Sequence, residues 1–132
     1  MSETRYRSNY ALVEFSEHLG DDEDDLDVPW AEFVGDRSTE HEFSVPVEGA
    51  IDGYVTVQAL DVGTYGHEIL VNGESLSGFD IPPGEGWQCW MDVMAGVDLR
   101  KGENTIQVRR DTDADDSFVV GTLRVTWREP IE

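Results

Sequence analysis

The chain has almost no lysine, a single cysteine and no long apolar run, and each shortage excludes a class of protein. Lys101 is the one lysine among 9 basic residues, which stand against 29 acidic residues in a chain of 132. The formal charge of −20 opposes binding to nucleic acid or to an anionic membrane surface. Cys89 cannot form an internal disulfide, and no apolar stretch reaches the roughly 20 residues that cross a bilayer.

The chain also lacks a recognisable secretion signal. Residues 1–5 are polar and contain no apolar segment of the kind that a signal peptide requires. With no disulfide, nothing in the composition indicates an oxidising compartment. We therefore expect a cytoplasmic protein, with neither nucleic acid nor membrane among its partners.

The acidic residues are spread through the whole chain and are not confined to one end. This distribution argues against a disordered acidic tail and favours a surface adapted to high salt, where screening suppresses self-repulsion. Abundant acids with almost no lysine resemble proteins of halophilic archaea. The expected protein is thus a single domain, residues 1–132, from a halophilic organism.

Alternation of apolar and polar residues predicts an all-β protein. Seven segments alternate, at 10–16, 42–47, 54–61, 67–71, 87–94, 105–110 and 118–128, and a short strand follows the Asn72-Gly73 turn and ends at Leu76. Asn-Gly between two such segments is a strong hairpin signal, because both residues tolerate positive φ. Pro46 places its strand at a sheet edge. About eight short strands without a long helix predict an antiparallel β-sandwich or jelly roll.

Residues 17–39 break this alternation. The run from Asp21 to Asp25 precedes Pro29, Trp30 and Phe33. We interpret 17–39 as one long acidic loop held by buried aromatic side chains, with a helical turn over 30–34 that Pro29 opens.

Two motifs resemble the galactose-binding-like family of jelly rolls. The first is Ile69-Leu70-Val71-Asn72-Gly73, and the second runs from Leu99 through Gly102 and Asn104 to Val108. This family contains β-sandwich modules attached to many glycosidases as well as free-standing lectin-like domains. The resemblance covers about half of the chain and implies the fold. Both motifs are architectural, so they assign no ligand residue.

Two groups of residues suggest ligand contacts. On the strand 87–94, Trp87 shares a face with Cys89, Met91 and Val93, which predicts a core position and a buried, inert cysteine. The opposite face carries Trp90, Gln88 and Asp92, where an indole flanked by polar groups could stack on a sugar. A subunit interface or plain packing explains Trp90 as well. Tyr65 and His67, at a loop end, could line a binding mouth, and surface exposure is the alternative for His67.

The loop 111–116 has carboxylates at alternate positions, Asp111, Asp113 and Asp115. Alternate oxygens in a turn can converge on Ca²⁺ or a monovalent cation. Asp116 stands where the EF-hand pattern needs glycine, so a solvated acidic loop is the alternative. No other cofactor is expected.

No catalytic motif is present. The three histidines have no metal-ligand spacing, none is placed beside Cys89, and phosphate loops and Gly-x-Ser-x-Gly are missing. We therefore expect a non-catalytic binding module, with carbohydrate as its partner. The alternative is a structural or interaction protein that forms a homo-oligomer through its exposed aromatic strand.

The high-salt interpretation predicts that the fold needs molar salt. At 1 M salt the screening length falls to about 3 Å, which removes most of the repulsion between acidic side chains. The midpoint of thermal unfolding, followed by circular dichroism, should therefore rise from low salt to multimolar KCl. An unchanged midpoint would show that the acidity is unrelated to salt.

Overall fold

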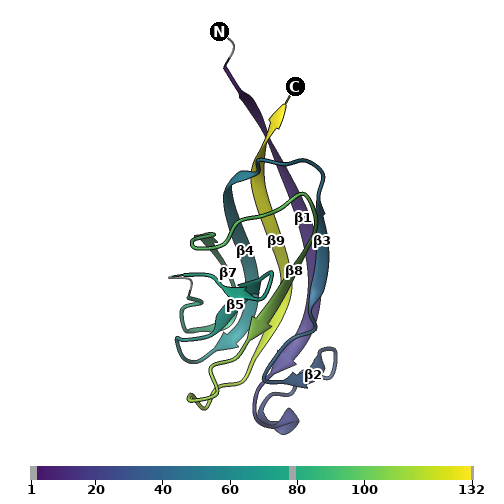
Figure 1. Ribbon diagram of the computed structural model, residues 1–132. Coiled ribbons are helices and arrows are strands. Elements are labelled where there is room, and N and C mark those ends of the chain that lie inside the picture. The colour runs from purple at the N-terminus through teal and green to yellow at the C-terminus, as the bar shows by residue number, and fades with distance from the viewer. Residues whose placement is uncertain (1–2, 78–79, 132) are drawn as a thin grey trace.

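Figure 1 shows the computed structural model of the chain, which describes residues 3–77 and 80–131. The described part contains the strands β1 (Arg5–Leu19), β2 (Glu32–Gly35), β3 (His41–Val45), β4 (Ile51–Val62), β5 (Glu68–Val71), β6 (Glu74–Ser75), β7 (Gly84–Val93), β8 (Gly102–Arg109) and β9 (Phe118–Ile131), with one short 3₁₀ helix, η1 (Glu23–Asp25). No helix within these residues has the length and apolarity needed to span a bilayer.

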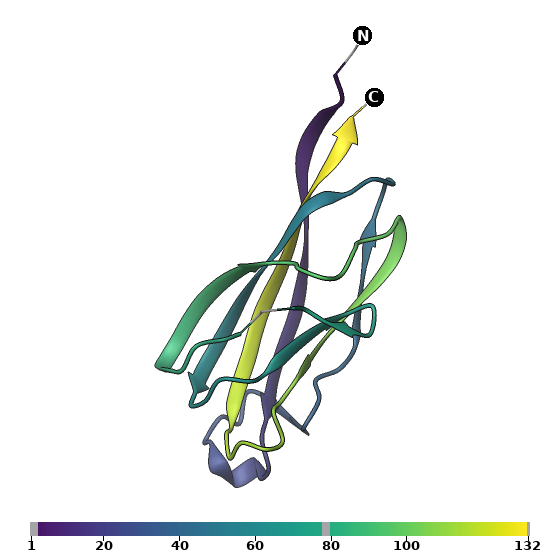
Figure 2. The same cartoon turned by 60° about the vertical axis from the view of Figure 1, so that its left-hand side comes forward.

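The strands form two sheets that pack face to face (Figures 1 and 2). The larger sheet has the order β2-β1-β9-β4-β7, and the smaller sheet has the order β3-β8-β5-β6. Every pairing is antiparallel except that of β1 with β2, which is parallel. The expected antiparallel β-sandwich is confirmed, as is the edge position of β3, which ends at Val45, just before Pro46.

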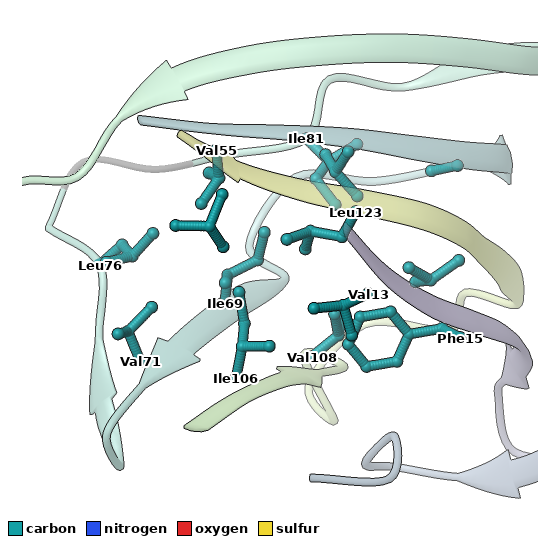
Figure 3. Close-up of a cluster of buried hydrophobic side chains, with 14 of the residues drawn as sticks. Val13, Phe15, Val55, Ile69, Val71, Leu76, Ile81, Ile106, Val108 and Leu123 are labelled. Atoms are coloured by element: carbon teal, nitrogen blue, oxygen red, sulfur yellow. The ribbon is translucent and has the colours of Figure 1, made fainter. Parts of the chain in front are cut away.

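The core lies between the inner faces of the two sheets, where the alternating apolar residues meet (Figure 3). The larger sheet contributes Val13, Val55 and Leu123, and the smaller sheet contributes Ile69 and Ile106. Removing such side chains from water is the main favourable contribution to folding. The alternating apolar residues of β1, β3, β4 and β9 lie mostly on this buried side.

The two resemblance motifs meet in a single turn structure. Asn72 and Gly73 have φ values of 53° and 81°, as the predicted hairpin requires. The Asn72 side chain donates to Asn104 Oδ1 at 2.9 Å and accepts from the Thr105 backbone N–H at 2.9 Å. Asn104 is fully buried and also accepts from the Arg100 N–H at 3.1 Å. Both motifs are thus architectural, as expected.

The segment 17–39 differs from the predicted loop. Residues 17–19 continue β1, and residues 32–35 form β2, which pairs with β1 in register from Glu17 and Glu32. The prediction of a helical turn over 30–34 is wrong, because residues 32–34 belong to β2 and pair with β1. The one helical turn lies at η1, where Asp22 caps the Asp24 N–H at 2.9 Å. Trp30 is also not buried, since 54% of its surface is exposed.

β1 and β9 are longer than the alternation predicted, and a buried carboxylate joins them near the chain ends. Glu129 is fully buried and accepts hydrogen bonds from Arg7 Nε at 3.0 Å, Asn9 Nδ2 at 3.0 Å and Trp127 Nε1 at 2.9 Å. Burial raises the pKa of Glu129, but the hydrogen bonds from Asn9, Trp127 and Arg7, with the charge of Arg7, outweigh it and lower the pKa below its ordinary value.

This lowered pKa makes a prediction about stability and pH. A carboxyl group whose pKa is lower in the folded state stabilises the fold above its unfolded pKa, about 4.3, and loses that contribution as the pH falls through the folded value. Glu129→Gln should cost about 2 kcal/mol of unfolding free energy at neutral pH, since charged hydrogen bonds are lost. Urea unfolding should show this difference shrinking below about pH 4. If Glu129→Gln lowered the unfolding free energy equally at neutral pH and below about pH 4, this prediction would be contradicted.

Candidate functional site

The strand β7 carries three of the five ligand-contact residues proposed from the sequence, and it forms one margin of the larger sheet. Its register with β4 pairs Gln88 with Ala59, Trp90 with Val57 and Asp92 with Val55. Opposite residues in an antiparallel pair point to the same side, so these three side chains point the same way as core residues. The smaller sheet ends at the two-residue strand β6, which leaves Trp90 41% exposed.

The polar neighbours of Trp90 already make contacts within the chain. Gln88 Nε2 donates to the Pro82 carbonyl at 2.6 Å, and Asp92 Oδ1 accepts from the Val93 N–H at 2.8 Å. A ligand stacked on Trp90 would therefore compete with these hydrogen bonds. Sugar contact at Trp90 stays a prediction.

The other face of β7 corrects the sequence interpretation. Trp87, Cys89, Met91 and Val93 are exposed, although the alternation suggested a core position and a buried cysteine. Their partners on β4 include Leu60, Gln58 and Thr56, which belong to the outward side of the sheet. Alternation shows which residues share a face of the strand, but the position of the smaller sheet decides which of the two faces is buried.

Tyr65 and His67 lie in and beside the loop between β4 and β5, and they have opposite environments. Tyr65 is 60% exposed and free to contact a ligand, whereas His67 is buried. His67 Nδ1 accepts from the Asp111 backbone N–H at 3.0 Å, so its Nε2 carries the proton and donates to Asp116 at 2.7 Å. Neither a surface position nor a binding mouth fits His67, because both ring nitrogens are engaged inside the protein.

Asp116 is a buried residue whose role the sequence did not reveal. Its carboxylate accepts from the backbone N–H groups of Gly63 at 3.0 Å and Thr64 at 3.2 Å, as well as from His67. A Cβ at position 63 would lie 2.7 Å from Asp116 Oδ1, so glycine is needed there. Asp116 therefore joins the loop before β9 to the loop after β4.

The proposed cation ligands do not converge. Within residues 3–77 and 80–131, no three His, Cys, Asp or Glu side chains gather closely enough to hold a metal ion. Asp111 Oδ1 instead accepts from the Asp113 N–H at 3.0 Å, closing a local turn. Asp113 and Asp115 are exposed, which agrees with a solvated acidic loop.

A polar hollow of about 460 Å³ lies beside this loop, and its charges are largely paired internally. Arg110 is buried and donates to Asp21 at 2.6 Å and to Asp36 at 2.7 Å. Arg109 donates to Glu68 at 2.7 Å, so two of the arginines that line the hollow already have partners. The acidic segment 17–39 is anchored here by ion pairs rather than by aromatic side chains alone.

The outward side of the larger sheet, here named the outer face, is the most ligand-like surface. It consists of alternate residues of β1, β9, β4 and β7: Tyr10, Leu12, Glu14, Thr122, Arg124, Thr126, Tyr54, Thr56, Gln58, Leu60, Trp87, Cys89, Met91 and Val93. Two shallow hollows of about 250 and 140 Å³ adjoin at Arg124, which lines both. A larger hollow of about 580 Å³ near the chain ends has no aromatic lining.

Aromatic and aliphatic side chains flank these hollows. Tyr10 and Leu12 lie on the β1 side, and Trp87 lies on the β7 side, 52% exposed. The Trp87 ring lies across the sheet, because a Cβ at Gly121 would be only 3.0 Å from its Cζ3 atom. Trp30 from the acidic segment packs beside it, with ring centroids 5.9 Å apart. Two indoles thus form one continuous apolar surface.

Polar groups occupy the floor between the two flanks. Gln58 and Arg124 are exposed there, and no ion pair involves Arg124 among the described residues. The hydroxyl oxygens of Thr56 and Thr126 have no hydrogen-bond partner within the described residues. Glu14, whose Oε1 accepts from the Thr122 hydroxyl at 2.7 Å, is the acidic residue among those that define the outer face. The outer face thus combines aromatic surface with unused hydrogen-bonding groups.

The structural role of Asp116 can be tested separately from any ligand. Asp116→Asn replaces an acceptor with a donor facing two backbone N–H groups, so it should lower the unfolding free energy by about 1–3 kcal/mol. Asp115→Asn, on the same loop but exposed, is the matched control and should change little. Urea unfolding of both variants measures the difference, and equal effects would contradict the structural role.

The fold is similar to that of a known binding domain. The crystal structure of the CBM36-1 domain, a carbohydrate-binding module of a multidomain xylanase from the hindgut metagenome of Trinervitermes trinervoides, matches with a TM-score of 0.59. The match covers 89% of this chain and 96% of that chain at 14% sequence identity. At this identity the match shows a shared fold alone, and it agrees with the β-sandwich expected from the sequence.

Sequence comparison assigns the chain to a family without indicating an activity. No curated protein matches the sequence. A family model matches residues 7–129, from early in β1 to near the end of β9, and so spans both sheets. The chain therefore belongs to the family of unknown function DUF7383.

Proposed function

We propose that this chain is a non-catalytic carbohydrate-binding domain that holds its ligand on the outer face. The observation that carries this proposal is the aromatic surface of Trp87 and Trp30 beside a polar floor containing Gln58 and Arg124. Sugars present apolar C–H faces that stack on aromatic rings, and their hydroxyls need nearby polar groups. The fold shared with a carbohydrate-binding module supports the same conclusion.

The geometry suits an extended ligand better than a single sugar. The hollow near Cys89 and Thr122 adjoins the hollow near Tyr54 and Thr126, and Arg124 lines both. Together they run along the outer face between the flank of Trp87 and the flank of Tyr10. A short oligosaccharide could lie along this path with its ends on the two aromatic flanks.

A binding role without chemistry also fits the polar groups of the outer face. Arg124 and Gln58 can hold sugar hydroxyls, and Glu14 is engaged with Thr122. General acid–base catalysis on a glycoside normally needs two carboxyl groups placed on either side of the bond. Among the described residues, no carboxylate lines the hollows of the outer face, so we assign no catalytic residue.

The acidic surface accompanies this function as an adaptation to molar salt. The outer face is poor in acids although the chain has 29 of them. Contacts that rely on stacking and on uncharged hydrogen bonds depend less on screening than ion pairs do. Neutral sugars should therefore bind in concentrated KCl.

Titration of the purified protein with neutral oligosaccharides in multimolar KCl tests the proposal. Tryptophan fluorescence should shift saturably, because two of the four tryptophans lie at the proposed site. Trp87→Ala should weaken binding about tenfold or more through loss of the stacking surface. Isothermal titration calorimetry measures the same affinities independently of fluorescence.

Trp90→Ala is the matched control, since Trp90 lies on the same strand but points to the other side of the sheet. It should leave the affinity within about twofold of the wild type. The opposite result, with Trp90→Ala losing affinity and Trp87→Ala keeping it, would move the site to the margin proposed from the sequence. A panel of neutral oligosaccharides without any saturable binding would contradict the proposal as a whole.

A further inference from the structure

Between Trp87 and Met91 the strand β7 is a sheet edge without charge or proline. An exposed edge presents unpaired backbone groups to other chains, and natural proteins shorten such strands or block them with charge or proline. The described part of the chain has three other edges. The strands β2 and β6 have four and two residues. The strand β3 contains Glu42, follows Glu40 and is followed by Pro46. The strand β7 has ten residues, with its two acids, Glu85 and Asp92, near the ends.

The backbone geometry shows which groups of β7 are unpaired. The Met94 N–H donates to the Gly53 carbonyl at 2.9 Å, and these residues are opposite each other in the register of β4 and β7. In an antiparallel ladder, alternate residues exchange hydrogen bonds with the same neighbour. The backbone groups of Asp92, Trp90 and Gln88 therefore face β4.

The intervening residues direct their backbone groups away from the sheet. These are Trp87, Cys89 and Met91, followed by Val93, whose N–H is already held by the Asp92 side chain at 2.8 Å. Among the described residues, the N–H groups of Trp87, Cys89 and Met91 have no backbone partner, and they are spaced symmetrically about Cys89. A strand with this symmetry can pair with an identical strand around a two-fold axis.

We propose that β7 pairs antiparallel with β7 of a second copy of this chain, with the two-fold axis at Cys89. Trp87 then lies opposite Met91 of the second copy, and Cys89 lies opposite Cys89. Contacts between sulfur and an aromatic ring are favourable, and aromatic cross-strand pairs stabilise a sheet. The two larger sheets become one continuous sheet, and each outer face stays open.

Charge explains why a second copy fits this edge. Like charges directly opposite destabilise a strand pair. In this register the residues from Trp87 to Met91 pair with one another, and none of them is acidic although the chain carries −20. Pairing also covers part of the exposed apolar surface of Met91, which is 60% exposed in the single chain. The inference does not depend on sugar binding.

The remaining acids oppose association in dilute salt. Two copies of charge −20 repel at a distance until the screening length falls from about 10 Å at 0.1 M salt to about 3 Å at 1 M. The dimer should therefore be roughly tenfold or more tighter in molar KCl than in dilute buffer.

Mass and cross-linking measurements on the full chain test the pairing. Size-exclusion chromatography with light scattering in multimolar KCl should give twice the chain mass of 14.8 kDa. Opposite residues in a hydrogen-bonded pair have Cα atoms about 5.5 Å apart, within the range that a disulfide bridges. Copper-phenanthroline oxidation should therefore join two chains through Cys89, the single cysteine.

Two variants separate this edge from other surfaces. Met91→Pro removes a free N–H without touching the ladder to β4, so it should give a monomer, whereas the control Met91→Ala should remain dimeric. Cys89→Lys places two like charges opposite each other and should also give a monomer, while Cys89→Ser should not. Circular dichroism tests whether each variant is folded. If Met91→Pro does not fold, the mass of Cys89→Lys tests the pairing through β7.

Three results would overturn the inference. The first is a monomeric wild type at every salt and protein concentration. The second is a dimer that survives in the folded Met91→Pro and Cys89→Lys variants, which would place the interface elsewhere. The third is a dimer that these variants dissociate but that oxidation leaves uncrosslinked, which would exclude the two-fold axis at Cys89. Sugar titrations of the wild type are unaffected by any of these results.

Discussion

The strand β9 is hydrogen-bonded on both sides, to β1 and to β4, and the larger sheet depends on this double pairing. Its inward residues, among them Leu123, Val125 and Trp127, are buried against the smaller sheet. Its outward residues, Thr122, Arg124 and Thr126, form the floor of the outer face. One strand therefore supplies both the centre of the core and the centre of the candidate site, because successive side chains point to opposite sides.

Buried polar groups hold the two ends of the sandwich. Glu129 joins β1 to β9 near the chain ends. Asp116 and Arg110 hold the loop between β8 and β9, which lies at the opposite end of the sandwich (Figure 1). Each is compensated by hydrogen bonds or by an opposite charge, as burial of an ionised group requires. A chain with so many acids thus uses a few of them inside the fold and leaves most in solvent, where molar salt can screen them.

The two proposals concern different parts of the same strand. The side chain of Trp87 belongs to the outer face, whereas the backbone of Trp87, Cys89 and Met91 belongs to the sheet edge. Side chains point above and below a sheet while backbone groups point within its plane, so a ligand and a second copy need not compete. Pairing at β7 would place two outer faces side by side, which raises the effective concentration of sites for a long polysaccharide.

The sequence alone determined the all-β class, the hairpin at Asn72-Gly73 and the sharing of faces along each strand, because these follow from local alternation and turn chemistry. It did not determine which face of β7 lies inward. Both faces carry a tryptophan, and the answer depends on how far the smaller sheet extends. The path of residues 17–39, with β2 beside β1 and Arg110 between Asp21 and Asp36, was likewise decided by contacts between residues far apart in the chain. Tertiary structure decided these features because the order of residues along one segment does not show which distant segment packs against it.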